Sequence, residues 1–202
     1  MTTTPVRDDV AAVAERHVVA LGGTIEALRA ESPRIAAWGR ELADRLLAGS
    51  RLLAAGNGGS AAEAQHLTAE LVGRFDGDRR AFSAISLHAD TSALTAIAND
   101  YGYAESYARQ VTAHARPGDV LVLLSTSGTS SNLVRAAEAG REAGAVVWAM
   151  TGPGPNPLSA AADDALTLPG VGANVQEAQL VAVHALCRVF DAIVHDRLGA
   201  TR

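Results

Sequence analysis

The stretch DVLVLLSTSGTSS, residues 119–131, joins the pattern of a buried strand to a cluster of hydroxyl side chains. Its first half is almost continuous in Val and Leu, which is typical of a parallel strand covered by helices on both faces. Its second half, residues 125–131, holds six Ser or Thr side chains around one glycine. A helical pattern follows at about 130–143. The order of strand, polar turn and helix predicts one unit of an α/β fold.

The same order recurs on both sides of this stretch. Four more short apolar runs, which we predict to be strands, lie at 51–56, 82–88, 145–152 and 165–169. Helical patterns lie after them at about 60–74, 91–115, 156–163 and 174–197, and two more precede them at 8–31 and 34–48. The pattern predicts a doubly wound α/β fold with a mainly parallel five-stranded sheet flanked by helices. We expect one domain over residues 1–202, with N-terminal helices at about 8–48 and the sheet-and-helix core at about 50–198.

The composition excludes several classes of protein. All 17 basic residues are Arg, so the chain lacks the lysine that Schiff-base enzymes and P-loop NTPases need. A net charge of −5 disfavours a nucleic-acid partner, because phosphate contacts need clustered positive charge. The sequence has no apolar run of about 18–20 residues and no signal-peptide pattern at its start. With Cys187 as its lone cysteine, it predicts a cytoplasmic protein without a membrane partner.

Two glycine- and hydroxyl-rich turns mark a candidate ligand site, because ligands of such sheets bind beyond the carboxyl ends of the strands. Residues 56–60, GNGGS, follow the first run, but a plain tight turn explains so short a motif equally well. Residues 125–131 open a helix, where free backbone N–H groups and hydroxyls bind phosphate without a lysine. A single Ser or Thr would cap this helix. Because residues 125–131 hold more hydroxyls than a helix N-cap needs, we favour a phosphate-binding site over simple capping.

Three other polar patches have ordinary structural explanations when each is taken alone. His66 and Glu70 share one helical face and could hold a metal ion, although an exposed pair at this spacing is more common. Residues 99–100, Asn-Asp, fit a turn that ends a helix. His184 lies in the apolar stretch 180–186 of the last helix, where a histidine usually belongs to the core. Each patch acquires a functional meaning only in combination with the others.

In combination, the patches resemble the SIS domain of phosphoheptose isomerases in both order and spacing. The resemblance covers about residues 10–195. The motifs that carry it are Gly56–Ser60 with His66, Glu70 and Gly73-Arg74; Ala98–Gly102; Ser125–Gly128; Ala149–Gly152; and Gln176-Glu177 with His184.

The resemblance implies an enzyme that interconverts sedoheptulose 7-phosphate and D-glycero-D-manno-heptose 7-phosphate through an enediol. It also implies a cytoplasmic homotetramer with one zinc ion per subunit. Glu70 would be the base and His184 the acid. The zinc ligands would be His66, Glu70, Gln176 and His184. The substrate contacts would be Asn57, Gly58, Gly59, Ser60, Glu70, Arg74, Asn99, Asp100, Ser125, Thr126, Ser127, Ser130 and Gln176.

The spacing of two of these ligands adds a geometric expectation. Gln176 and His184 are eight residues apart, which in a regular helix is about 12 Å of rise and about 80° of rotation. Ligand atoms must come within about 2 Å of a zinc ion. We therefore expect an active site between subunits, with His184 supplied by a neighbouring chain.

Departures from the family pattern keep other functions open. Residues 172–175 are GANV, where the family commonly has an Asp and an Arg, so the rate or the preferred substrate is open. One alternative is a non-catalytic SIS protein that binds a sugar phosphate or a replication initiator, although such proteins typically lack the Glu and His found here at 70 and 184. Another is an isomerase for a different sugar phosphate, which the zinc-type residues disfavour. A sugar-sensing regulator would need a DNA-binding segment, and none is evident.

Overall fold

The computed structural model describes residues 10–199, in which five strands form one parallel sheet. The strands are β1 (Leu52–Gly56), β2 (Ala84–Ser86), β3 (Val120–Ser125), β4 (Val146–Thr151) and β5 (Asp164–Thr167). Their order is β2-β1-β3-β4-β5, and all four pairings are parallel. The predicted doubly wound α/β fold is therefore confirmed. In this strand order the crevice for a ligand lies between the carboxyl ends of β1 and β3.

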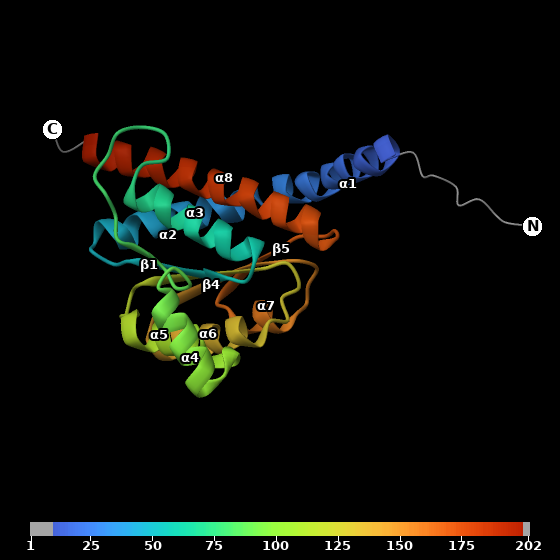
Figure 1. Ribbon diagram of the computed structural model, residues 1–202. Helices are drawn as coiled ribbons and strands as arrows, with labels where there is room; N and C mark the ends of the chain where they lie inside the picture. Colours follow the sequence, from blue (N-terminus) through green and yellow to red (C-terminus); the bar gives the residue numbers. More distant parts are fainter. Residues whose placement is uncertain (1–9, 200–202) are drawn as a thin grey trace, which may run out of the picture.

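Helices cover both faces of the sheet (Figure 1). One layer contains α1 (Val10–Ala30), α2 (Ser32–Leu47), α3 (Gly59–Val72) and α8 (Gly172–Gly199). The other contains α4 (Thr91–Tyr101), α5 (Ala108–His114), α6 (Ser131–Glu142) and α7 (Pro157–Ala161). Alternate residues of each strand enter one of two hydrophobic clusters, as the pleat requires: Val120, Val122 and Leu124 pack with α8, and Leu121 and Leu123 pack with α6.

Two predicted elements differ from those observed. The helix predicted at 91–115 is broken, because α4 ends before Gly102 and the short 3-10 turn η1 (Tyr103–Glu105) separates it from α5. Gly102 has a φ of 87°, a conformation that ends a helix and that residues other than glycine adopt rarely. The strand predicted at 82–88 is reduced to Ala84–Ser86, which pairs only with β1 at the sheet edge. The predicted helix start at residue 8 lies outside the described residues.

Helix α8 is long and apolar enough to cross a membrane, judged by length and composition alone. Half of its most apolar stretch is buried inside the fold. Its buried side chains, among them Val183, Leu186 and Phe190, pack against the sheet and α2. This burial is typical of the core helix of a globular domain, and the expected lack of a membrane partner stays a prediction.

Candidate active site

The turns after β1 and β3 meet and form a small polar pocket, which we call the cradle. Its volume is about 80 Å³. The cradle is lined by Asn57, Ser60, Leu124, Ser125, Thr126, Ser127, Ser130 and Leu133. Six of these residues were predicted from sequence to contact the substrate. Because α3 and α6 both begin here, the free N–H groups of two helix starts add to the hydroxyl donors.

The backbone of the cradle depends on glycine. Gly128 has a φ of 65°, and a Cβ at this position would overlap the side chain of Asn156. Gly58 also has a positive φ, of 57°, and a Cβ at Gly56 would overlap the Ser60 carbonyl. Ser130, at the N-cap of α6, makes no side-chain cap hydrogen bond. The hydroxyls of the cradle are therefore not explained by capping of α6.

Asn57 is fixed by a set of residues that the sequence analysis did not identify. Its side-chain amide donates to Asn132 Oδ1 (3.0 Å) and its Oδ1 accepts from Asn132 Nδ2 (2.9 Å). Tyr103 donates its hydroxyl to the same Oδ1 (2.9 Å), and Tyr107 donates to the Gly56 carbonyl (2.6 Å). Burial raises the pKa of Tyr107, so this phenol stays a donor. Two features of the sequence could have pointed to these residues. Asn132 directly follows the hydroxyl-rich stretch 125–131, and Tyr103 belongs to the Tyr-Gly-Tyr sequence at 101–103.

A second, larger pocket lies between α3 and α8, and we call it the groove. Its volume is about 390 Å³. The groove is lined by Gly59, Ala62, Glu63 and His66 of α3 and by Gln176, Leu180 and His184 of α8. The α3 residues recur at helical spacing, so they form one face. Gly59 in the groove and Ser60 in the cradle are adjacent in sequence, which makes the two pockets neighbours.

Three of the predicted metal ligands meet at one end of the groove. His66 Nε2 lies 2.9 Å from His184 Nε2 and 3.2 Å from Glu70 Oε1. The His184 ring also packs against Phe75, with the ring centroids 5.5 Å apart. Both histidines and the carboxylate belong to the same chain. The expectation that a neighbouring chain supplies His184 is therefore wrong for this pairing, because α3 and α8 run side by side and bring His184 to His66.

The donor set at this end suits zinc, which binds imidazole nitrogen and carboxylate oxygen. Neighbouring ligand atoms of a tetrahedral zinc lie about 3.3 Å apart, close to the two distances around His66. In residues 10–199, however, no group of three His, Cys, Asp or Glu side chains is arranged to hold an ion. The three groups are paired with one another instead. Gln176 lies against Gly59, where a Cβ would overlap its amide, about two helical turns from His184.

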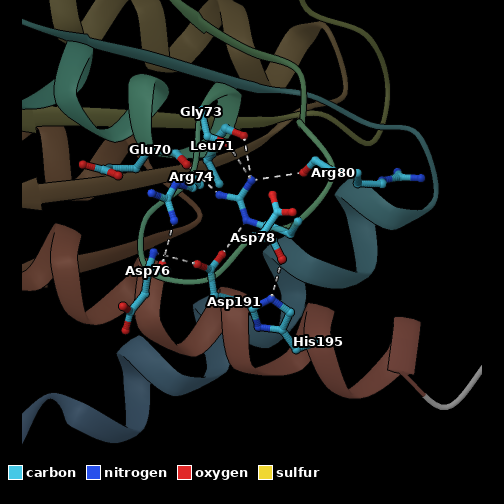
Figure 2. A network of polar contacts seen from close by, with 10 residues as sticks. Glu70, Leu71, Gly73, Arg74, Asp76, Asp78, Arg80, Asp191 and His195 are labelled. Atoms are coloured by element: carbon cyan, nitrogen blue, oxygen red, sulfur yellow. Dashed lines mark hydrogen bonds and ion pairs between the residues drawn. The ribbon is translucent and has the colours of Figure 1, made fainter.

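Five predicted substrate contacts line neither pocket: Gly58 and Glu70, described above, and Arg74, Asn99 and Asp100. Asn99 and Asp100 lie exposed at the end of α4, where Asn99 Nδ2 donates to Asp100 Oδ1 (2.8 Å). Arg74 is exposed in the loop after α3. Figure 2 shows Arg74 beside Glu70, with a contact to the carbonyl of Asp76. The structure thus places these three residues outside both pockets.

A buried arginine holds the end of α3 that carries Glu70. Arg79 Nη2 donates to the Glu70 carbonyl (2.6 Å) and Nη1 to the Leu71 carbonyl (3.1 Å), while Nε pairs with Asp191 of α8 (2.6 Å). The two side chains are only 1% and 6% exposed. Figure 2 shows Glu70, Leu71 and Asp191, the three partners in these contacts. The ion pair therefore joins the helix of Glu70 to the helix of His184, a contact that was not predicted from the sequence.

Glu63 is the other groove residue that the sequence analysis did not identify. The residue is 6% exposed, and its Oε2 is buried without a hydrogen-bond partner among the described residues. Burial raises the pKa of its carboxyl to about 7. Its position three residues before His66, on the same helical face, was the available signal.

Known proteins agree with this architecture in sequence and in structure. The SIS domain family matches residues 17–152. The phosphoheptose isomerase of Streptomyces coelicolor is 62% identical over 175 residues, which cover 86% of this chain and 74% of the relative. That of Geotalea daltonii is 47% identical over 161 residues, covering 79% and 84%.

Solved structures give the same result. A phosphoheptose isomerase from Francisella tularensis superimposes with a TM-score of 0.85 at 32% identity, over 91% of this chain and 98% of the other. The phosphoheptose isomerase of Neisseria gonorrhoeae has a TM-score of 0.78 at 36% identity, over 89% and 99%. The chain therefore belongs to the phosphoheptose isomerase family of SIS-domain enzymes.

Proposed function

We propose that this protein interconverts sedoheptulose 7-phosphate and D-glycero-D-manno-heptose 7-phosphate. The observation that supports this most directly is the contact between the cradle and the groove at Gly59 and Ser60. A phosphate held in the cradle would leave the carbon chain free to extend along α3 toward His66, Glu70 and His184. Binding at the remote end would then hold C1 and C2 at the acid–base groups.

The reaction moves one proton between C1 and C2 and a second between their oxygens. Glu70 would remove the proton from C1 of the ketose and return it to C2 of the enediol. His184 would donate a proton to the C2 oxygen and remove one from the C1 oxygen. The Arg79 contact to the Glu70 carbonyl would keep the base at a fixed distance from His184, because Arg79 also binds α8 through Asp191.

We further propose one zinc ion per subunit, held by His66, Glu70, Gln176 and His184. When bound, zinc would polarise the C1 and C2 oxygens as a Lewis acid. The donor types and the meeting of three of these side chains support the site, although the side chains would have to open around the ion. A cytoplasmic homotetramer with active sites between subunits, binding neither nucleic acid nor a membrane, remains our prediction for the assembly.

The test is turnover of sedoheptulose 7-phosphate, followed by appearance of the aldose, with added zinc and with chelator. We expect activity that requires zinc and a fall in kcat of about 10²–10⁴-fold in Glu70→Gln, because the amide cannot accept the proton. Glu142→Gln, an exposed change on α6, is the matched control and should keep full activity. Equal rates for Glu70→Gln and Glu142→Gln would rule out the assignment of the base.

A further inference from the structure

The position of Glu63 in the groove is not explained by the fold. The residue is 6% exposed, yet its Oε2 has no hydrogen-bond partner among residues 10–199. Burying a polar group without a partner costs free energy that an apolar side chain of the same size would not cost. The other carboxyls buried this deeply are paired, as Asp119 is with Arg51 and Asp191 is with Arg79. An unpaired carboxyl facing a pocket indicates a partner that arrives with the ligand.

The position of Glu63 along α3 indicates which part of the ligand would supply the missing hydrogen-bond partner of its carboxyl. Ser60 lines the cradle, Glu63 lies one helical turn further on, and His66 lies one turn beyond Glu63. Each step is about 4.5 Å of helix rise. A substrate with its phosphate in the cradle and its C1 and C2 at His66 must pass Glu63 with its middle carbons. These carbons carry hydroxyl groups, which donate to carboxyl oxygens.

We propose that Glu63 is a substrate-binding residue that accepts a hydrogen bond from a hydroxyl on the middle carbons of the sugar phosphate. This inference rests on the proposed function, because it assumes that the ligand spans the cradle and the groove. Glu63 would favour a polyhydroxylated chain long enough to reach from the phosphate pocket to His66 and Glu70. The remaining lining of this part of the groove, Ala62 and Leu180, offers no side-chain hydrogen bond to such a chain.

The test compares Glu63→Met and Glu63→Gln with Glu142→Met, the same change at an exposed position of α6 that lines neither pocket. For Glu63→Met we expect a KM for sedoheptulose 7-phosphate about 10–100-fold higher, because a hydrogen bond to a charged group is lost. Its kcat should stay within about threefold, because Glu70 and His184 are intact. Glu63→Gln should restore part of the binding, since its amide oxygen still accepts a hydrogen bond but carries no charge. Glu142→Met should behave as the unsubstituted protein.

Thermal unfolding separates a binding role from a structural one. Removing an unpaired buried carboxyl should raise the Tm of metal-free Glu63→Met by about 2–4 °C while binding weakens. Asp119→Asn is the control, because Asp119 accepts hydrogen bonds from the backbone and side chain of Arg51 and should lose Tm. A Glu63→Met variant with a lower Tm and a lower kcat together would overturn the inference in favour of a structural role.

The remaining outcomes separate this inference from the proposed function. An unchanged KM in Glu63→Met, with normal turnover, would overturn the inference and leave the isomerase intact. If the unsubstituted protein binds sedoheptulose 7-phosphate in calorimetry but does not turn it over, the proposed function fails. In that case the Kd values for sedoheptulose 7-phosphate still test the role of Glu63. A weaker Kd in Glu63→Met than in the unsubstituted protein would support a substrate-binding role, and equal Kd values would overturn it. Absence of any binding by the unsubstituted protein would overturn both.

Discussion

Glu63 is a single residue whose ionisation opposes folding. Burial raises the pKa of its carboxyl from the ordinary 4.5 to about 7. Below about pH 4.5 the carboxyl is protonated in both the folded and the unfolded chain, so it does not affect stability. As the pH rises, the unfolded chain loses the proton first, and the free energy of unfolding falls until the folded carboxyl is also ionised above about pH 7.

Comparison of the metal-free protein with Glu63→Gln isolates this contribution, because the amide is neutral at every pH. We expect the variant to gain stability relative to the unsubstituted protein between pH 5 and pH 8, by about 1–2 kcal/mol. His66 and His184 are present in both proteins, so they do not contribute to the difference between the two. The measurement is urea unfolding at several pH values with chelator present. A difference that stays constant across this range would contradict the raised pKa.

Single residues also mark the limit of prediction from sequence. The hydroxyls of residues 125–131 could be assigned to one pocket, because their spacing after an apolar run fixes the edge of the sheet at which they lie. Glu63 and Asn132 could not be assigned in this way. Their importance depends on what each side chain faces, and a carboxyl without a partner has the same appearance in a sequence as one in a salt bridge.

At the scale of elements, the Arg79–Asp191 pair fastens the loop after α3 to both α3 and α8. We expect Arg79→Met to lower the free energy of unfolding by about 3–5 kcal/mol, because it leaves Asp191 buried and unpaired. It also removes the donors to the carbonyls of Glu70 and Leu71 at the end of α3. Guanidinium unfolding of the metal-free protein measures the loss.

Two further variants test whether the loss of stability in Arg79→Met comes from leaving a charge buried and unpaired. Arg135→Met breaks solvent-screened ion pairs with Glu105 and Glu138, so it should cost far less stability than Arg79→Met. The double change Arg79→Met with Asp191→Leu removes both buried charges and should recover part of the stability lost in Arg79→Met alone. A loss in Arg79→Met no larger than that in Arg135→Met would contradict the assigned role.

The elements themselves were largely predictable, and their contacts were not. Apolar runs located all five strands, since strands buried on both faces need continuous apolar sequence. The helix predicted at 91–115 runs through the break at Gly102 because residues on both sides keep a helical pattern, although Asn99 and Asp100 fit a turn that ends a helix. The meeting of His66 and His184 depends on how α3 packs beside α8. Residue spacing within one helix gives no information on that packing, so spacing led to the wrong source for His184.

At the scale of the whole molecule, α1 is only partly packed against the rest of the fold. Figure 1 shows its first half extending beyond the body of the fold, at the opposite side from the end of α8. Val10, Val13, Val18 and Val19 are exposed there, and only Thr24 and Leu28 of this helix are buried. His17 holds the helix to α8 through Glu177 (2.8 Å). An isolated helical turn is marginal in water, so this apolar segment needs a further packing partner.

We expect that partner to be α1 of other subunits in the predicted homotetramer. Light scattering coupled to gel filtration should give a mass about four times the 20.8 kDa of the chain. The double change Val18→Glu with Val19→Glu should shift this mass to a smaller species, because burying two carboxylates at an apolar interface is costly. Leu198→Glu, an exposed change at the far end of α8, should keep the larger mass. A chain that runs as a monomer, or a double variant that assembles normally, would show that the exposed valines have another role.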